Sequence, residues 1–319
     1  MIKVAFVGCG GIMQEHYKHL CELPRVKLVG HCDIIGDRAE AAAGRFGGEA
    51  FTECEAMYDK VKPHAVFIAV PPYAHGRIEE AAAERGIHLF IEKPIAIDRK
   101  TAKRIAAAIR KAKVLSSVGY CFRYFDTSAL ACQILKGKAI SLVTGWWNGG
   151  MPGVWWWRQM DKSGGQIMEQ TTHLFDLMRY LCGNVAEVYA VASKGCQNHV
   201  EDYTVHDSSV VAMRLKNGAS ATITSSCVCN HGGETALRVV TPEATYAFSH
   251  GRFEIMEAGK TTVHHPTVDM FEEEDRIFIE AVRMGKRNRI KSVYPDALKT
   301  FYVTCAANES IESGLPVKP

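Results

Sequence analysis

Long apolar runs, an excess of one charge and repeated segments are all missing from this sequence of 319 residues. No stretch reaches the roughly 18 apolar residues that a membrane helix needs, and no basic, apolar signal segment opens the chain. The formal net charge is only +3, which gives no electrostatic case for nucleic acid or for an anionic membrane. We therefore expect no nucleic acid partner and no membrane attachment.

Paired cysteines are missing as well. The 11 cysteines are scattered, and most fall in expected strands or helices, as buried reduced thiols do. Cys227 and Cys229 alternate along an expected strand, where sheet packing explains them better than a metal. His264-His265 has no partner at metal-ligand spacing. The pattern predicts a reducing, cytoplasmic location, and we expect no metal site.

The composition is that of a globular protein, with 47% hydrophobic and 23% charged residues, and the length suggests two domains. Short apolar strands alternate with helices at first, which predicts an α/β Rossmann domain with a doubly wound parallel sheet over residues 1–121. Residues 122–319 contain strand-like runs joined by turns such as Asn217-Gly218. We predict an α+β domain there, with a mostly antiparallel open sheet and a C-terminal helix able to pack back on the first domain.

The first 20 residues carry the most informative pattern. A short apolar strand ends at Gly8, Gly10 and Gly11, and a helical pattern follows. Backbone N–H groups and the positive end of the helix dipole meet at such a turn, which favours phosphate. Met13 takes the place of the last small residue in the dinucleotide fingerprint, so we expect wider helix packing or a small residue opposite.

Asp33 ends the second expected strand, 20 residues after Met13. That spacing suits the acidic residue that binds the adenosine ribose, and a carboxylate there repels a 2′-phosphate. NAD is therefore favoured over NADP. An ordinary strand–turn–helix with Asp33 as a cap is the alternative, but the order of strand, glycines, helix and acid favours a dinucleotide.

Other polar or rigid residues follow the ends of further strands. Pro71 and His75 come after the apolar strand at 65–70, and Lys93 follows the strand at 88–91. Ligands of open parallel sheets bind at these carboxyl ends. Lys93 before a proline could be a solvated turn residue, but its place after a central strand favours function. His75 at a helix start is more often structural.

A polar face marks a helix that we expect over about residues 166–182. Glu169, His173 and Asp176 fall on one side at helical spacing, so their side chains can share a pocket. The alternative is a solvated polar stripe with i,i+4 pairing. The preceding Ser163-Gly164-Gly165 loop favours the pocket.

All five tryptophans lie between residues 146 and 157. Indole rings stack on the C–H faces of sugars, so we predict a substrate wall that includes some of Trp155, Trp156 and Trp157. Arg158 could bind hydroxyls or a carboxylate. Arg123 and Tyr124 follow the first domain and could line the same cleft.

Several motifs together resemble the Gfo/Idh/MocA family of NAD(P)-dependent sugar and polyol oxidoreductases. They are GCGGIM near the start, AVPPYAH at 69–75, EKP at 92–94, GYCFRY at 119–124, GGQIMEQTTHLFD at 164–176 and ANESIESG at 307–314. The resemblance implies a Rossmann domain and a substrate domain whose sheet builds homodimers or homotetramers. The cofactor contacts that it implies are Gly8, Gly10, Gly11, Ile12, Met13, Asp33, Val70, Pro71, Pro72, His75, Glu92 and Lys93.

The resemblance also implies catalytic roles. Lys93 resembles the lysine that reaches the substrate hydroxyl and the nicotinamide, and His173 resembles the general acid/base. Glu169 stands where the family usually has Asp, and Thr171 replaces a usual glycine. An imidazole with a pKa near ~6.5 can accept the hydroxyl proton while a hydride leaves carbon. Glu169 or Asp176 could orient that imidazole, and Asp176 could also contact the substrate.

These inferences predict an NAD-dependent oxidoreductase that acts on a secondary hydroxyl or ketone of a sugar, glycoside or cyclitol. A redox-neutral glycosidase or lyase that uses NAD on the same scaffold stays open, as does a non-catalytic NAD sensor.

Overall fold

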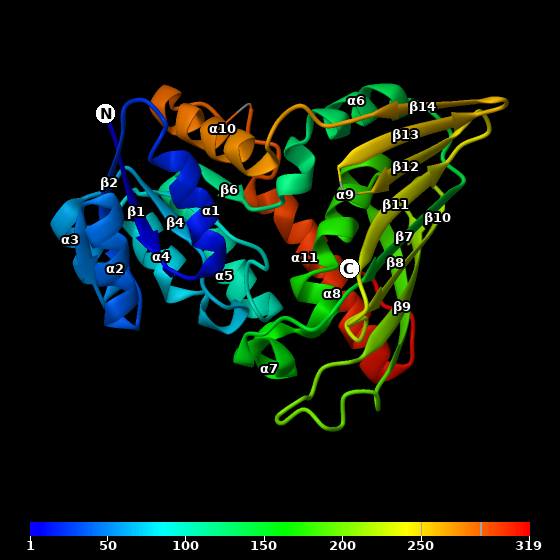
Figure 1. Cartoon of the computed structure of the whole chain (residues 1–319), viewed down its shortest axis with the longest axis horizontal. Coiled ribbons are helices and arrows are strands. Elements are labelled where there is room, and N and C mark those ends of the chain that lie inside the picture. The colour runs from blue at the N-terminus through cyan, green and yellow to red at the C-terminus, as the bar shows by residue number, and fades with distance from the viewer. Residues whose placement is uncertain (250, 288) are drawn as a thin grey trace. The chain divides into compact units, whose positions relative to one another are not determined.

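The computed structural model describes residues 1–249, 251–287 and 289–319, which form two compact units (Figure 1). Unit 1 joins Met1–Tyr124 to Asp269–Ala297, and unit 2 joins Phe125–Val268 to Leu298–Pro319. A segment from late in the chain therefore belongs with the N-terminal unit. The boundary between residues 121 and 122 stays a prediction. In the described ranges, no helix is both long and apolar enough to cross a membrane.

Unit 1 contains a six-stranded sheet in the order β3-β2-β1-β4-β5-β6, with every neighbouring pair parallel. The strand order reverses between β1 and β4, so the predicted doubly wound Rossmann sheet is confirmed. Its elements are β1 (Ile2–Val7), α1 (Gly11–Leu20), β2 (Val26–Cys32), α2 (Gly36–Phe46), β3 (Glu49–Phe51), α3 (Cys54–Val61), β4 (Ala65–Ile68), η1 (Pro72–Ala74), α4 (Arg77–Glu84), β5 (His88–Ile91), α5 (Arg99–Ala112), β6 (Ser116–Val118), η2 (Cys121–Tyr124) and α10 (Met270–Met284).

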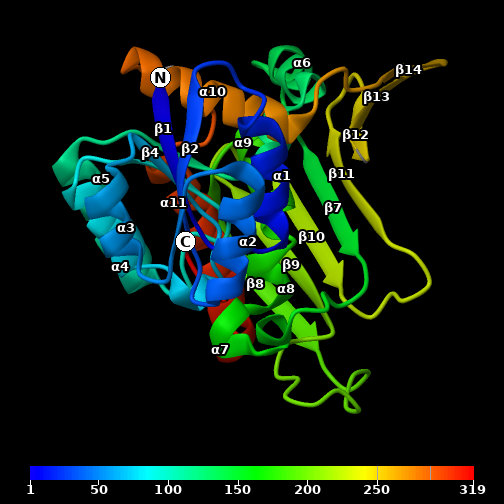
Figure 2. The same ribbon diagram turned by 60° about the vertical axis from the view of Figure 1, so that its left-hand side comes forward.

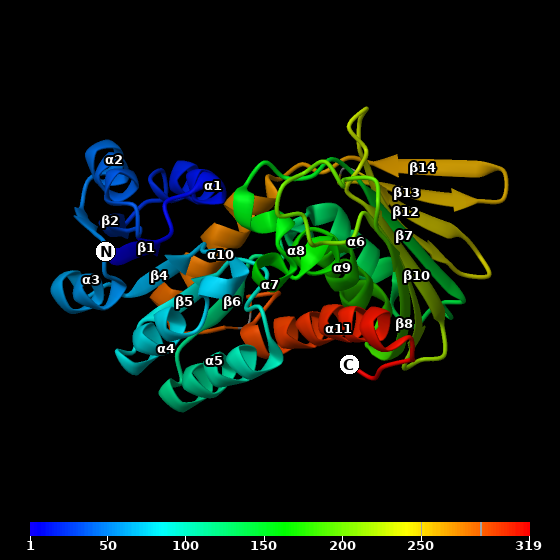
Figure 3. The same ribbon diagram turned by 90° about the horizontal axis from the view of Figure 1, so that it is seen from below.

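Helices cover both faces of this sheet. Figure 3 shows α1, α2 and α10 on one side and α3, α4 and α5 on the other. β4 is buried along its whole length, as its uninterrupted apolar sequence predicts. Phe278 of α10 packs edge-on against Phe67 and Phe90, with ring centroids 5.5 and 5.6 Å apart. The late helix α10 thus completes the core beside α1.

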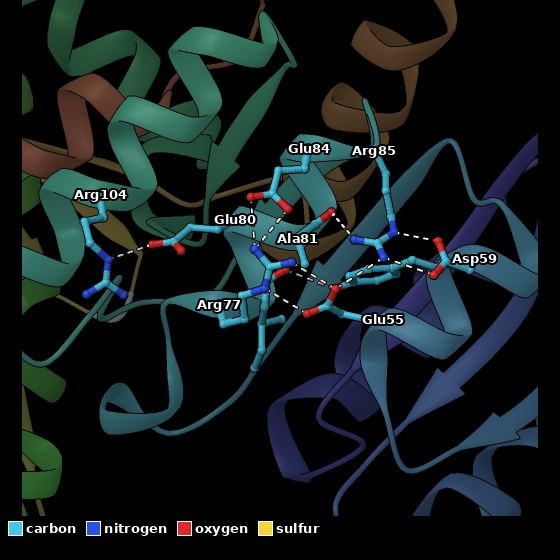
Figure 4. Close-up of polar contacts among 10 residues, drawn as sticks. Glu55, Asp59, Arg77, Glu80, Ala81, Glu84, Arg85 and Arg104 are labelled. Atoms are coloured by element: carbon cyan, nitrogen blue, oxygen red, sulfur yellow. Dashed lines mark hydrogen bonds and ion pairs between the residues drawn. The ribbon is translucent and has the colours of Figure 1, made fainter.

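Ion pairs join the three helices α3, α4 and α5 at the surface (Figure 4). Arg77 and Arg85 of α4 both bind Glu55 of α3, and Arg104 of α5 binds Glu80 of α4 at 2.9 Å. The Arg77 bond holds the pKa of the exposed Glu55 carboxyl below its usual value, although burial works weakly in the other direction. Because solvent screens such pairs, we assign them a small share of stability.

Unit 2 contains an eight-stranded sheet in the order β14-β13-β12-β11-β7-β10-β9-β8. Among the described residues of this sheet, only β7 and β10 pair in parallel, so the predicted mostly antiparallel sheet is confirmed. Figure 2 shows the long strands β7, β10 and β9 side by side. The elements are α6 (Asp126–Leu135), β7 (Leu142–Asn148), η3 (Trp155–Arg158), α7 (Met160–Ser163), α8 (Gly165–Glu169), α9 (Thr172–Cys182), β8 (Val185–Ser193), β9 (Ser208–Leu215), β10 (Ser220–Ser226), β11 (Glu234–Val240), β12 (Thr245–Ser249), β13 (Arg252–Glu257), β14 (Lys260–His264) and α11 (Tyr294–Ser313), whose first turn belongs to unit 1.

Alternation along the strands separates the two faces of this sheet. In β9 every second residue is buried and its neighbours are exposed. Figure 3 shows helices α6, α8, α9 and α11 gathered on one face. The exposed side of β8 and β9 carries Tyr189, Val191 and Val210, each more than two fifths exposed.

Candidate active site

The glycine turn lies between β1 and α1 in unit 1, as predicted. Gly8 has a positive φ of 84°, and a Cβ there would lie 2.2 Å from the carbonyl oxygen of Ala69. Only glycine therefore lets this turn approach the end of β4. A Cβ on Gly10 or Gly11 would meet no atom within 4 Å. The N-terminus of the ten-residue helix α1 thus faces an open space that suits a phosphate.

The residues after the glycines divide between surface and core. Ile12 is exposed, whereas Met13 is fully buried. Met13 packs in the apolar core with Val4, Phe6 and Tyr17. This burial describes the side chain alone, so the predicted cofactor contact of Met13 stays a prediction.

Asp33 follows β2 and turns its carboxylate toward the glycine turn. Its Oδ2 accepts a hydrogen bond from the Cys9 backbone N–H at 2.9 Å, and its Oδ1 accepts one from the Ile35 N–H at 2.9 Å. These bonds fix the carboxylate beside the turn where the ribose contact is predicted. Burial, more than any neighbouring charge, raises the pKa of the Cys9 thiol, so Cys9 adds no negative charge there.

The loop after β4 holds His75 firmly. The Nδ1 of His75 lies 2.6 Å from Glu79 Oε1, and Glu79 Oε2 accepts the Gly76 N–H at 2.7 Å. Both side chains are buried. The pair anchors the start of α4 and sets the path of Val70, Pro71 and Pro72 just before it, so the geometry supports the structural interpretation of His75.

Glu92 and Lys93 follow β5. The Lys93 backbone N–H donates to Glu92 Oε2 at 3.1 Å, and Glu92 Oε1 lies 3.2 Å from His16 Nε2. Lys93 is half-buried, whereas Glu92 is only 5% exposed. Both oxygens of Glu92 have partners inside unit 1, and its predicted cofactor contact stays a prediction.

The predicted continuous helix over 166–182 is wrong. The chain forms α8 up to Glu169 and resumes as α9 at Thr172. At the break, the Thr171 N–H bonds to the Gln166 carbonyl, five residues back, at 2.9 Å. Such local widening is common at functional sites. It also means that Glu169 and His173 do not share one regular helical face.

Each residue of the expected triad has its own surroundings in unit 2. The His173 ring stacks on Trp147 of β7, with centroids 6.0 Å apart and an interplanar angle of 18°. Glu169 Oε2 accepts the indole N–H of Trp157 at 2.9 Å. Asp176 is buried and accepts the Thr300 hydroxyl at 2.7 Å, so its predicted substrate contact is corrected to a bond with α11.

The tryptophan segment divides by exposure. Trp155 is 52% exposed, with the ammonium of Lys162 4.7 Å from its ring centroid. Trp156 and Arg158 are half-buried. Trp157 is fully buried, so it has no surface for a sugar and does not belong to the predicted wall.

Arg123 and Tyr124 are buried in unit 1 rather than exposed on a cleft. The Arg123 guanidinium donates to the Lys291 carbonyl at 2.6 Å and pairs with Asp296 at 2.8 Å. The Tyr124 hydroxyl accepts the Lys291 N–H at 3.1 Å. The predicted substrate contacts are corrected: both side chains secure the segment before α11.

Sequence reasoning missed a buried ionisable cluster of His16, Glu274 and Asp275 beside Glu92. His16 Nδ1 lies 2.8 and 3.0 Å from the two Asp275 oxygens. In the sequence His16 reads as one position of the α1 pattern, and the two acids follow Glu272 and Glu273 in an apparently solvated run. Only full burial distinguishes Glu274 and Asp275 from Glu272 and Glu273, and burial cannot be read from this run of acidic residues in the sequence.

Two family models match the chain, one in each half. A model described as an oxidoreductase family with an NAD-binding Rossmann fold matches residues 2–120, and the GFO/IDH/MocA C-terminal domain model matches residues 137–247. The relative scyllo-inositol 2-dehydrogenase (NAD(+)) of Bacillus subtilis (strain 168) is 26% identical, with 99% of this chain and 96% of the relative covered. Inositol 2-dehydrogenase of Rhizobium meliloti (strain 1021) is 27% identical over 75% of this chain and 72% of its own length.

A solved structure agrees with these sequence matches. Levoglucosan dehydrogenase in complex with NADH and levoglucosan has a TM-score of 0.90 and 20% identity, with 99% of each chain covered, which shows a shared fold. The glycine turn, the carboxylate of Asp33 and the parallel sheet of unit 1 suit the NAD-binding Rossmann fold that the first model describes. The chain belongs to the Gfo/Idh/MocA family of oxidoreductases and carries its NAD-binding Rossmann domain.

Proposed function

We propose that the protein transfers a hydride between NAD and a secondary hydroxyl or ketone of a sugar, glycoside or cyclitol. The observation that carries the proposal is the open glycine turn at the start of α1 beside the fixed carboxylate of Asp33. The names of the matched relatives, two inositol dehydrogenases, support a polyol substrate. NAD supplies the hydride acceptor when it is bound.

The remaining steps fall to side chains of this chain. His173 accepts the proton of the substrate hydroxyl as the hydride leaves carbon, which imidazole does well at neutral pH. Stacking on Trp147 fixes the plane of the His173 ring, so its nitrogens keep one direction. Lys93 donates a hydrogen bond to the same hydroxyl and stabilises negative charge on the oxygen.

Cofactor choice follows from Asp33. Its two oxygens already accept backbone N–H groups and keep lone pairs for ribose hydroxyls. The carboxylate repels a 2′-phosphate, so we propose that NAD is preferred to NADP. The other proposed cofactor contacts are Gly8, Gly10, Gly11, Ile12, Met13, Val70, Pro71, Pro72, Glu92 and Lys93. The proposed substrate contacts are Trp155, Trp156 and Arg158.

The test is a screen of sugars, glycosides and inositols with NAD and NADP in parallel, read by NADH absorbance. We expect NADH formation with at least one polyol and with NAD. His173→Ala should keep NADH binding and lose orders of magnitude in turnover. Product without net NADH would favour the redox-neutral alternative, and tight NADH binding without any product would favour a sensor.

We also propose that copies of the chain assemble through the exposed face of the unit 2 sheet. Val191 and Val210 are cross-strand neighbours, and Tyr189 lies two residues away on the same face. Charged residues in the middle of such a face oppose burial. Val191→Lys should therefore shift the mass measured by light scattering from a dimer or tetramer toward a monomer. An unchanged mass, or a wild-type monomer, would contradict the assembly.

A further inference from the structure

A buried ionisable cluster lies in unit 1 next to the Lys93 backbone. It consists of His16 of α1, Glu92 after β5, and Glu274 and Asp275 of α10, none more than 5% exposed. Neither cofactor binding nor the proposed proton transfer uses His16 or the two α10 acids. Burying such groups is costly unless they are paired, so the cluster calls for a role beyond packing.

His16 occupies the centre of the cluster between two carboxylates. Its Nδ1 faces Asp275 at 2.8 Å and its Nε2 faces Glu92 at 3.2 Å. A ring with an acceptor at each nitrogen donates from both and is cationic. Burial lowers the pKa of His16, but the two carboxylates outweigh burial and raise it well above its usual value.

The other ionisable groups around the cluster do not displace the pairing of His16 with Asp275 and Glu92. Burial raises the pKa of Glu274 well above its usual value, and Glu92 and Asp275 raise it further, which favours the uncharged form of Glu274. His19 and Asp269 also face the cluster at its α1–α10 side. Cys121 faces it from η2 as a neutral thiol, since burial raises its pKa.

The carboxylate of Glu92 packs directly against Gly119. A Cβ on Gly119 would lie 2.2 Å from Glu92 Oε1, so the carboxylate fills the space above this glycine. With Oε1 directed at His16, Oε2 accepts the Lys93 N–H at 3.1 Å. The chain of contacts runs from Asp275 through His16 and Glu92 to the backbone of Lys93.

We propose that Glu92 is a positioning residue for Lys93, and that the His16–Asp275 pair holds Glu92 in the orientation that receives the Lys93 amide. The proposal rests on the proposed function only in giving Lys93 a catalytic role. A displacement of a reacting group by one ångström can reduce a rate by about a hundredfold, so loss of this support should lower kcat. α10 would then contribute to catalysis through Asp275, 259 residues away from His16 in the sequence.

The test compares wild type with His16→Gln, Asp275→Asn and Gly119→Ala, the last of which displaces Glu92 without removing a charge. His88→Gln is the control, because His88 is a half-buried imidazole at the other end of β5 that accepts the Leu115 N–H. The first readout is hydrogen exchange at the Lys93 amide, resolved by fragmentation mass spectrometry. The second is the division of effects between kcat, KM and the Kd for NADH.

We expect exchange at the Lys93 amide to rise by roughly fivefold or more in the three variants and to stay unchanged in His88→Gln. With a polyol that the wild type oxidises, kcat of the three variants should fall by about tenfold or more, while their Kd for NADH changes less than about threefold. Wild-type exchange and kcat in both His16→Gln and Asp275→Asn would overturn the proposal. If the wild type oxidises no polyol, the proposed function fails, and the exchange readout still decides the positioning role.

Discussion

Replacing Gly8 and Gly10 one at a time by alanine should separate the folding role of the glycine turn from its binding role. Gly8 has φ +84°, and its added Cβ would lie 2.2 Å from the Ala69 carbonyl oxygen and 2.8 Å from the Ala69 carbonyl carbon. These are backbone atoms at the end of a buried strand and cannot move aside. Gly10 is the N-cap of α1 with φ −78°, and its added Cβ would meet nothing within 4 Å.

The expected magnitudes follow from these surroundings. Left-handed backbone costs alanine about 1–2 kcal/mol, and overpacking adds roughly 1–3 kcal/mol, so Gly8→Ala should lose about 2–5 kcal/mol of stability. For a unit of this size that is a fall in Tm of roughly 5–15 °C. Gly10→Ala changes only a helix cap and should cost less than about 1 kcal/mol.

For NADH binding, Gly10→Ala is the more informative of the two variants. In Gly10→Ala the new methyl enters the space where we place the pyrophosphate, so the Kd for NADH should rise at least about tenfold while Tm stays within roughly 3 °C. Differential scanning fluorimetry and NADH fluorescence titration measure the two quantities. Wild-type affinity in a stable Gly10→Ala protein would refute a phosphate site at this turn.

Three further predictions concern buried ionisable groups. Glu274→Gln should raise Tm over that of the wild type at neutral pH, with a gain that grows from pH 5 to pH 8, because the raised pKa of Glu274 costs the folded state stability as pH rises above the ordinary Glu value; an equal gain at both pH values would contradict this. Glu79→Ala removes the bonds to His75 and to the Gly76 N–H and should cost about 2 kcal/mol in urea unfolding, whereas Glu79→Asp tests whether length matters. Burial lowers the pKa values of His31 and His88, so the stability that each neutral ring contributes is lost as pH drops below about 6.5, and the Tm of the wild type should fall relative to that of His31→Gln and of His88→Gln between pH 7 and pH 5; a Tm difference that does not change with pH would be inconsistent with neutral buried rings.

Local patterns explain which parts of the site could be predicted. The strand, the glycines, α1 and Asp33 are close in sequence and each obeys a short-range rule, so the Rossmann sheet and its turn followed from residues alone. The break before α9 did not, because the bond from Thr171 back to Gln166 gives no signal in the side-chain periodicity. Helical spacing therefore placed Glu169 and His173 on one regular helix, whereas they belong to α8 and α9, and Glu169 also bonds Trp157.

Burial and long-range pairing account for the other corrections. Trp157, Arg123 and Tyr124 have side chains common at sugar sites, but each is buried. The His16–Asp275 pair joins residues 259 apart, and no local pattern connects them. Such contacts depend on how α10 packs beside α1, which a single sequence does not specify.

The central claim is that Lys93 and His173 act on the same polyol in an NAD-dependent oxidation. The most direct measurement is turnover of Lys93→Ala, His173→Ala and the double variant with the best polyol from the screen, alongside the Kd of each for NADH. The account predicts near-native NADH binding in all three, losses of about a hundredfold or more in each single variant, and a double variant little worse than either, because groups that act as a unit are not additive. Wild-type turnover in either single variant would contradict it.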